Sequence, residues 1–214
     1  MHAVNAAPFL RVLIVDDHPV VREGLRAILD RQPEMAVVAE ASDGEQAVAL
    51  FDRHYPDLTL MDLRLPKKSG VDATAEIHRR HPQARIIVFT VFDGDEDIYR
   101  ALEAGARSYL LKSASHEELL STLRNVATGG RPLPAAVAER LAQRFEYSEL
   151  TCRELDVLRL IVAGKANKQI ASLLGVGEGT VKTHVNRIIL SKLGVADRTE
   201  AAIQALQRGI VRSD

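Results

Sequence analysis

The sequence predicts an α/β domain with a doubly wound, five-stranded parallel sheet, followed by an all-α helix-turn-helix domain of four helices. Five short, unbroken apolar runs in the first two thirds of the chain alternate with segments of helical spacing, whereas the last third shows helical spacing only. Runs this short and continuous suit strands that are buried on both faces. Their alternation with helices implies parallel pairing, and we expect the strand order 2-1-3-4-5. The runs are Leu13–Val15, Met35–Ala39, Leu58–Met61, Ile86–Phe89 and Tyr109–Leu111.

Apolar residues three or four positions apart mark the helices between these strands. The first such stretch contains Val21, Leu25 and Leu29, the next contains Ala47 and Phe51, and a later one contains Ile98, Ala101 and Leu102. Each connection is short, so the domain should be compact.

The composition is that of an ordinary globular protein: 46% of the 214 residues are hydrophobic and 27% are charged. No apolar run reaches the roughly 18 residues that a membrane span needs, so we expect no membrane segment. The first nine residues lack the basic and apolar regions of a signal peptide. The single cysteine, Cys152, excludes an internal disulfide and fits a reducing compartment. We therefore expect a cytoplasmic protein.

The charge is distributed unevenly along the chain. Residues 1–148 contain 18 Lys and Arg against 22 Asp and Glu, whereas residues 149–214 contain 10 against 7. A contact with nucleic acid is therefore expected in the second part. The segment Gly129–Pro134 breaks the pattern, and Ala135 to Phe145 can form a helix. The predicted organisation is a tail (1–9), an α/β domain (10–128), a linker with a helix (129–147) and a helical domain (148–214).

Polar residues follow the predicted strands at one edge of the sheet. Asp16 and Asp17 end the first strand and Asp62 ends the third. Ligands bind beyond the carboxyl ends of parallel strands where the strand order reverses, so these carboxylates should converge. Two like charges about 4 Å apart repel by about 4 kcal/mol at an effective dielectric near 20, and a hard divalent cation, Mg²⁺ first, would offset that repulsion. Thr90 ends the fourth strand and Lys112 follows the fifth.

An acidic residue at a strand end is by itself an ordinary loop residue. Five polar positions at one edge of one sheet are a stronger signal, because a carboxylate beside Mg²⁺ and an ammonium is suited to accept a phosphoryl group. At this point the chain resembles the receiver domains of bacterial response regulators over about residues 10–128. The resemblance rests on Asp16-Asp17, Met61–Pro66 with Gly70, Thr90, Ala104–Ala106, and Tyr109 with Lys112.

The resemblance assigns roles to the acidic residues. It implies that Asp62 is phosphorylated and that Asp17 binds Mg²⁺ directly. Asp16 would act on the ion through water, and the backbone carbonyl of Arg64 would complete the protein ligands.

It also implies a switch around the phosphoryl group. Thr90 and Lys112 would contact the phosphoryl oxygens, and Tyr109 would swing inward when Thr90 moves. A hydroxyl that donates to a phosphoryl oxygen can bias a bistable loop and an aromatic rotamer. The alternative for Tyr109 is a half-buried strand tyrosine with no switching role.

The last third predicts helices from Thr151 to Gly164, from Asn167 to Leu174, from Glu178 to Leu193, and from Asp197 onward. Thr151 and Glu154 have the spacing of a capping box. A helix, a tight turn containing glycine and a second helix form the unit that enters the major groove of DNA.

The helix over 178–193 has two different faces. Val181, Val185, Ile188 and Ile189 lie on one side of its wheel, and a cation, a hydroxyl and an amide lie on the other. On an isolated helix such a polar face is most often simply solvated. Facing DNA, the same side chains could reach base edges or phosphates. They are Lys182, Thr183 and Asn186.

Residues 148–208 resemble the LuxR-type helix-turn-helix, and with the receiver this gives the domain order of the NarL/FixJ family. The matching residues include Leu150-Thr151 with Arg153-Glu154, Asn167-Lys168, Thr180–Lys182, His184, Lys192-Leu193 and Arg198–Ala201. The resemblance implies base reading by Lys182, Thr183 and Asn186, and phosphate contacts by Lys168, Thr180 and Lys192. Residues 197–208 would form the helix used for dimerisation on DNA.

Two features depart from that pattern. Gly177 stands where Ser or Thr usually caps the recognition helix, at a cost of a few tenths of a kcal/mol. The segment from His184 to Lys192 is one residue longer than usual, which on a regular helix rotates everything beyond it by about 100°. We hypothesise that a π-type bulge near 188–191 absorbs the insertion and keeps Leu190 inward. A regular helix would instead expose Leu190 and make the DNA contact of Lys192 doubtful.

The predicted function is that of a two-component response regulator. A sensor histidine kinase would phosphorylate Asp62, and this would control dimerisation and DNA binding, with RNA polymerase as a further partner compatible with that role. The chain would not be an enzyme beyond slow loss of its own phosphate. One alternative is a Mg²⁺-dependent phosphatase with Asp62 as nucleophile, although Arg64 stands where such enzymes commonly have a second acid. Another is a DNA-binding protein whose receiver is only a dimerisation scaffold.

Overall fold

The computed structural model describes residues 9–91, 94–144 and 150–211. The chain divides into two compact units, one built around a sheet and one built from the helices near the carboxyl terminus. The described residues leave out nearly all of the predicted tail. They also leave out residue 145 of the predicted linker helix and residue 148, the expected start of the second domain. No helix in the described part of the chain is long and apolar enough to cross a bilayer.

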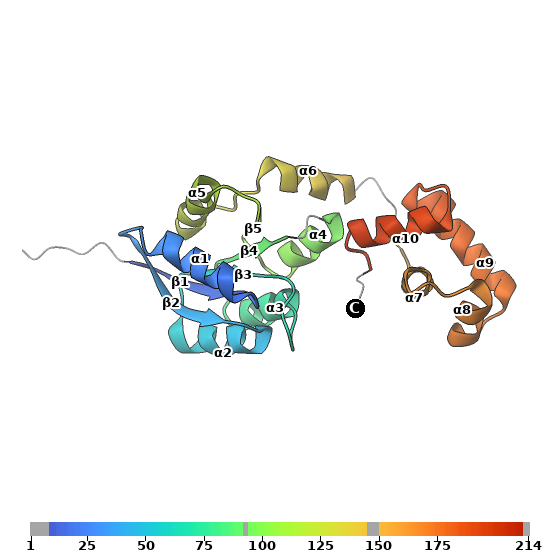
Figure 1. The fold of residues 1–214 in the computed structure, drawn as a ribbon, viewed down its shortest axis with the longest axis horizontal. Coiled ribbons are helices and arrows are strands. Elements are labelled where there is room, and N and C mark those ends of the chain that lie inside the picture. The colour runs from blue at the N-terminus through green and yellow to red at the C-terminus, as the bar shows by residue number, and fades with distance from the viewer. Residues whose placement is uncertain (1–8, 92–93, 145–149, 212–214) are drawn as a thin grey trace, which may run out of the picture. The chain divides into compact units, whose positions relative to one another are not determined.

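The first unit contains a five-stranded sheet of order β2-β1-β3-β4-β5, which confirms the predicted topology (Figure 1). All four pairs of neighbouring strands are parallel. Every residue of β3 and β4 is buried, as expected for strands covered on both faces. The strands are β1 (Leu10–Val15), β2 (Met35–Ala41), β3 (Leu58–Met61), β4 (Ile86–Thr90) and β5 (Ser108–Leu111).

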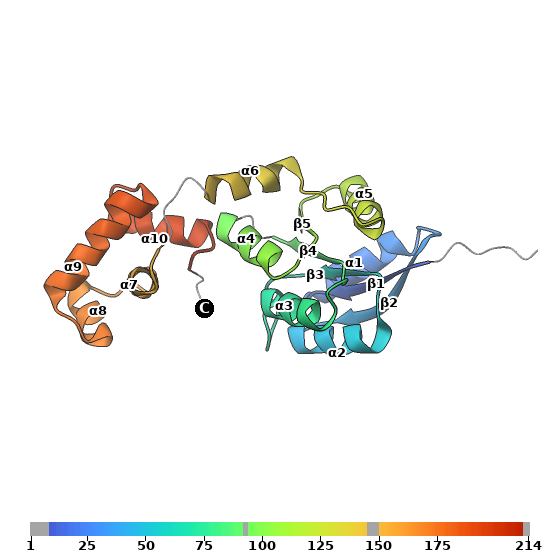
Figure 2. The ribbon, with the colours of Figure 1, turned by 180° about the vertical axis from the view of Figure 1, so that it is seen from behind.

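Two separate apolar cores lie on the two faces of this sheet. Val12 and Ile14 of β1 belong to one core, and their neighbours Leu13 and Val15 belong to the other, because successive strand residues point to opposite faces. Helices α1 and α5 cover the first face and α2 and α3 cover the second, as the two opposite views show (Figures 1 and 2). The helices are α1 (Pro19–Leu29), α2 (Gly44–His54), α3 (Gly70–Arg80), α4 (Asp95–Glu103) and α5 (His116–Ala127).

Side-chain caps fix the starts of three of these helices. Asp43 accepts a hydrogen bond from the amide of Gln46 at 2.8 Å at the start of α2. Ser69 and Ser115 cap α3 and α5 in the same way. Each cap satisfies an amide that has no partner within its own helix. The predicted linker helix is present as α6 (Ala135–Arg144), with Val137 buried.

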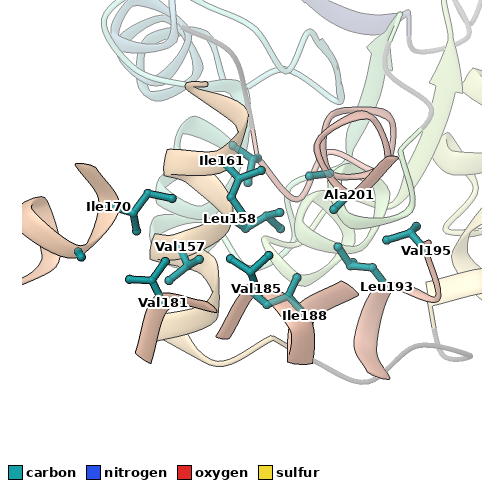
Figure 3. Close-up of a cluster of buried hydrophobic side chains, with 13 residues drawn as sticks. Val157, Leu158, Ile161, Ile170, Val181, Val185, Ile188, Leu193, Val195 and Ala201 are labelled. Carbon is teal, nitrogen blue, oxygen red and sulfur yellow. The ribbon is translucent and has the colours of Figure 1, made fainter. Parts of the chain in front are cut away.

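The second unit contains α7 (Cys152–Val162), α8 (Asn167–Leu174), α9 (Glu178–Arg187), a π-helix η1 (Ile188–Leu193) and α10 (Arg198–Gln207). Their apolar faces form one core, in which Leu158, Ile170 and Val181 are fully buried (Figure 3). Thr151 and Glu154 form the predicted capping box at the start of α7. Gly175 ends α8 in the left-handed region, with φ of 64°, where glycine avoids a steric cost.

The predicted third helix of this unit, 178–193, is not regular throughout. Its α-helical part ends at Arg187, and the remaining residues, Ile188–Leu193, form the π-helix. This confirms the hypothesis that a π-type distortion absorbs the extra residue. The inward position expected for the Leu190 side chain lies outside what the structure describes.

Candidate functional site

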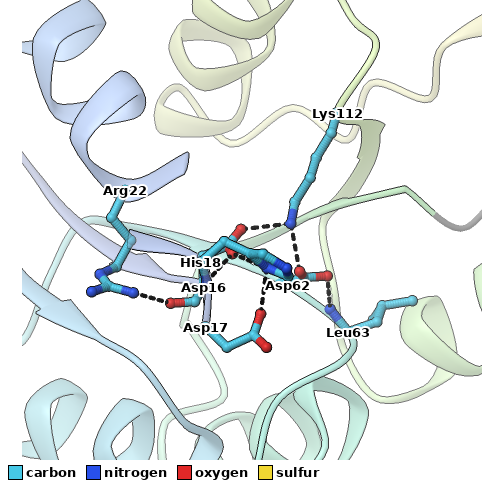
Figure 4. A network of polar contacts seen from close by, with 7 residues as sticks. All are labelled: Asp16, Asp17, His18, Arg22, Asp62, Leu63 and Lys112. Carbon is cyan, nitrogen blue, oxygen red and sulfur yellow. Dashed lines mark hydrogen bonds and ion pairs between the residues drawn. The ribbon is translucent and has the colours of Figure 1, made fainter. Parts of the chain in front are cut away.

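An acidic pocket lies at the carboxyl ends of β1 and β3 (Figure 4). Asp16 and Asp62 are almost fully buried, with 1% and 4% of their surface exposed. One ligand atom each from Asp16, Asp17, His18 and Asp62 all lie within 4.8 Å of one another. The predicted convergence of the three carboxylates is therefore present, because parallel β1 and β3 are direct neighbours in the sheet.

Lys112 supplies the cation of this pocket. Its Nζ lies 2.6 Å from Asp62 Oδ2 and 2.7 Å from Asp16 Oδ2. Burial by itself would lower the pKa of Lys112, but the hydrogen bonds to Asp16 and Asp62 outweigh it and raise the pKa above its ordinary value. Lys112 is therefore charged at neutral pH and offsets part of the repulsion between the carboxylates.

The loop after β3 wraps tightly around Asp62. The amide of Leu63 donates to Asp62 Oδ1 at 2.6 Å, and the amide of Gly70 donates to the carbonyl of Leu63 at 2.9 Å. A Cβ on Gly70 would lie 1.8 Å from the backbone oxygen of Asp62, which no real contact allows. Only glycine fits here, so Gly70 holds the loop that carries Asp62 and Arg64.

Two residues of this region were missed by the sequence reasoning. His18 Nδ1 lies 2.7 Å from Asp17 Oδ1, and Arg22 donates to the backbone oxygen of Asp16 at 2.7 Å. Both belong to the start of α1, which places them beside the end of β1. The only signal for them was their position within six residues of Asp16.

The pocket also contains atoms suited to further ligands. Asp17 Oδ1 is buried, and its contact with His18 does not have hydrogen-bond geometry, so that oxygen has a lone pair available to a cation. Three carboxylates with such an oxygen fit a hard ion such as Mg²⁺. The hydroxyl of Thr90 is fully buried and has no hydrogen-bond partner in the described part of the chain. A buried donor of this kind is costly unless a ligand satisfies it.

Tyr109 lies on β5, next to the strand that ends at Thr90. Val88 pairs with Tyr109, and Thr90 pairs with Leu111 two residues further along. The Tyr109 side chain is fully buried rather than half-buried. Thr90 and Tyr109 therefore lie near each other on adjacent strands, and Tyr109 is already turned inward in this structure.

The second unit carries a polar face on α9. Val181 and Val185 point into the core, whereas Lys182, Thr183 and Asn186 are exposed. The three predicted base-reading side chains thus share the outward side of one helix, as its 3.6-residue period requires. Thr183 also donates from Oγ1 to the carbonyl of Gly179 at 3.1 Å.

Two of the three predicted phosphate contacts are exposed. Lys168 lies in the first turn of α8 and Thr180 in the first turn of α9. Gly177 caps α9 without a side-chain hydrogen bond, as its lack of a hydroxyl dictates.

Lys192 differs from that expectation. Its Nζ lies 2.6 Å from Glu154 Oε2, and only 13% of its side chain is exposed. Glu154 belongs to α7 and is buried. The ammonium of Lys192 is therefore directed into its own domain, a position that does not favour the predicted phosphate contact.

Other basic residues of this unit also bind within it. Arg153 donates to the carbonyl of Leu174 at 2.8 Å, and Arg198 donates to Asn167 Oδ1 at 2.9 Å. These contacts join α7 and α10 to the two ends of α8. The modest basic charge of the unit is thus partly used for its own stability.

Known protein families match both parts of the chain. Residues 12–124 match the response regulator receiver domain, and residues 148–205 match the bacterial regulatory proteins of the luxR family. The transcriptional regulatory protein LiaR of Bacillus subtilis is 42% identical over 210 residues, which cover 94% of this chain and 99% of LiaR. This chain belongs to the response regulators with a LuxR-type DNA-binding domain.

Further response regulators match over nearly the whole chain. VraR of Staphylococcus aureus is 39% identical over 208 residues, covering 95% of this chain and 99% of VraR. A solved structure of two RcsB dimers bound to two parallel DNAs is 25% identical, with a TM-score of 0.71 and coverage of 94% of this chain and 98% of that one. The response-regulator resemblance therefore spans both units.

Proposed function

We propose that this chain is a two-component response regulator in which a sensor histidine kinase phosphorylates Asp62 and thereby controls dimerisation and sequence-specific DNA binding. The observation that carries the proposal is the Lys112 ammonium, which bridges the buried carboxylates of Asp16 and Asp62 in a chain that also has a helix-turn-helix. A phosphoacceptor needs a carboxylate with positive charge beside it. DNA-bound RcsB dimers support the DNA-binding part.

In the proposed reaction, a carboxylate oxygen of Asp62 attacks the phosphorus of a phosphohistidine. The new O–P bond replaces the N–P bond, and the imidazole leaves with the electron pair and takes up a proton. Asp16, Asp17 and Asp62, with the backbone carbonyl of Arg64, would hold Mg²⁺. The ion would neutralise charge on the carboxylates and on the phosphoryl oxygens.

After transfer, Lys112 and Thr90 bind the phosphoryl oxygens. Lys112 exchanges its contact with Asp62 Oδ2 for a phosphoryl oxygen, and the unpartnered hydroxyl of Thr90 gains an acceptor. A shift of Thr90 changes the space beside Tyr109 on the adjacent strand. Such a paired movement converts a local charge change into a change of surface.

In the helical unit, Lys182, Thr183 and Asn186 read bases, and Lys168 and Thr180 contact phosphates. Ile203 and Leu206 on α10 are 50% and 42% exposed, which supports α10 as the surface where two copies meet. A dimer would read two half-sites about one helical turn of DNA apart. A protein that binds chromosomal DNA in this way acts in the bacterial cytoplasm, where RNA polymerase is also present.

The test compares the wild type with Asp62→Asn, with and without acetyl phosphate as phosphodonor. The wild type should gain one phosphate in its intact mass and bind operator DNA more tightly, whereas Asp62→Asn should do neither. Asp30→Asn, an exposed position at the end of α1, is the matched control and should respond like the wild type. Equal stimulation of Asp62→Asn and wild type would refute the proposal, and so would turnover of a small phosphate ester, which would indicate a phosphatase.

A further inference from the structure

The π-helix after the recognition helix brings two distant core residues onto one face. Ile188 and Leu193 are five positions apart, yet both are buried in the same core (Figure 3). On a regular α-helix, residues five apart point about 140° away from each other. In a π-helix, residues five apart are hydrogen-bonded neighbours. The π-helix is thus what allows both side chains to be buried despite the extra residue.

The same segment is tied to α7 by a buried ion pair. Lys192 lies within η1, and its Nζ is 2.6 Å from Glu154 Oε2. The same carboxylate oxygen accepts from the amide of Thr151 at 2.8 Å, so the capping box of α7 holds Glu154 in place. Burial by itself would raise the pKa of Glu154, but the hydrogen bonds from Lys192 and Thr151 outweigh it and lower the pKa.

We infer that the Glu154–Lys192 ion pair fixes the rotation of the π-segment, and with it the rotation of the recognition helix α9, so that Lys192 is a positioning residue that does not contact DNA. The inference rests on the proposed DNA binding by α9. It follows from continuity, because α9 and η1 form one unbroken helical stretch. If the π-segment relaxed to a regular helix, the residues on its two sides would rotate by about 100° relative to each other.

The apolar core and the ion pair both act against that rotation. Val185 precedes the π-helix, Ile188 and Leu193 lie at its two ends, and all three are buried in the core. The ion pair adds a contact between two specific side chains to these apolar contacts. Separating the two would leave a buried carboxylate without its cation, which is strongly destabilising. Lys192 is thereby withdrawn from the surface, and Lys182 remains as an exposed cation of α9.

Salt dependence of DNA binding separates this role from two others. The probe is a mixed-sequence duplex of about 30 base pairs, roughly three helical turns. Each neutralised phosphate contributes about 0.9 to the slope of log affinity against log salt. Lys168→Met, the matched control at an exposed lysine proposed to contact a phosphate, should reduce the slope by about that amount. Lys192→Met, measured at a temperature where it is folded, should give a line parallel to the wild type and several-fold weaker.

The other outcomes each overturn the inference. If Lys192→Met reduces the slope as Lys168→Met does, Lys192 is a phosphate contact. A line that coincides with the wild type would make the ion pair purely stabilising. Lys192→Arg keeps the charge and should restore the affinity that Lys192→Met loses.

Thermal unfolding tests the pair without any DNA. Lys192→Met and Glu154→Gln should each lower the Tm of the helical unit by about 10 °C or more, whereas Lys168→Met, at an exposed position, should leave it unchanged. The double variant should lose less than the sum of the two single losses, because the second substitution removes a charge that is already unpaired. Additive losses would overturn the inference. If the wild type fails to bind the duplex, the proposed function fails, and this cycle still tests the ion pair.

Discussion

Lys112 Nζ lies 2.6 Å from Asp62 Oδ2, so the proposed phosphoacceptor has a cationic partner before any phosphate is attached. The same ammonium also neutralises part of the charge on Asp16. In the proposed function, Lys112 therefore has two roles: it stabilises the acidic pocket in the unphosphorylated protein, and it binds the phosphoryl group afterwards.

Replacing Lys112 with methionine should make the first unit depend on Mg²⁺ for its stability. Without the ammonium, the carboxylates repel each other, and breaking a buried ion pair in this way costs about 3 kcal/mol. Mg²⁺ binds the folded pocket and restores stability by mass action. Thermal unfolding with EDTA and with Mg²⁺ should therefore show a larger Mg²⁺-dependent rise in Tm for Lys112→Met than for wild type. Lys67→Met removes an exposed lysine that pairs with Asp43 and should respond like wild type. Equal shifts in all three proteins would contradict the role given to Lys112, and the absence of any shift would argue against a metal-binding role for the pocket.

Gly70→Ala should disrupt the loop that carries Asp62. The added methyl group would meet the Asp62 carbonyl at 1.8 Å, so the backbone must move. We expect a loss of at least about 2 kcal/mol in the free energy of unfolding and a loss of phosphorylation with acetyl phosphate. Gly24→Ala is the matched control. Gly24 lies in helix α1, and a methyl group there would meet no neighbouring atom within 4 Å. It should raise the free energy of unfolding by about 0.5–1 kcal/mol. A stable, phosphorylated Gly70→Ala protein would contradict this account of the loop.

The pocket could be predicted from the sequence because its geometry follows from strand order. Once β1 and β3 are parallel neighbours, Asp16 and Asp62 must lie at the same edge. The capping box of Thr151 and Glu154 could be predicted for a similar reason, since it depends on local spacing alone.

The contacts between distant helices could not be predicted in this way. Glu154 and Lys192 are 38 positions apart, and their meeting depends on the π-helix between Ile188 and Leu193. A wheel drawn with the regular period places Lys192 at a different angle. Its resemblance to a family position therefore suggested a DNA contact, whereas the structure directs it to a carboxylate within its own domain.

The stability of the helical unit should depend on acid pH through Glu154. Its pKa is lowered in the folded protein relative to the ordinary value of 4.5, because its hydrogen bonds outweigh burial. A group whose pKa falls on folding stabilises the protein above its unfolded pKa, and that contribution is lost as the pH falls through the folded pKa. The difference in Tm between wild type and Glu154→Gln should thus be large at pH 7 and shrink progressively below about pH 4.5. The other carboxylates are present in both proteins, so their effects on Tm cancel when the two Tm values are subtracted. A difference that stays constant down to pH 3 would contradict the lowered pKa.

Deleting Ile189 should be tolerated, because the π-helix contains one more residue than a regular helix needs. After the deletion, Ile188 and Leu193 are four positions apart, which puts both on the same face of an α-helix. Lys192 then still reaches Glu154, and the apolar core keeps its members. We expect a Tm equal to or above that of the wild type, undiminished helical circular dichroism and unchanged salt dependence of DNA binding.

The control for that deletion removes Arg159, an exposed residue in the regular helix α7. No π-turn is available there to release a residue, so Leu158 and Ile161 become two positions apart and can no longer both face the core. The helical unit of this variant should lose its cooperative unfolding transition. If deletion of Ile189 also abolishes the cooperative transition, the fold needs the extra residue. That result would contradict the view that the π-helix only absorbs an insertion.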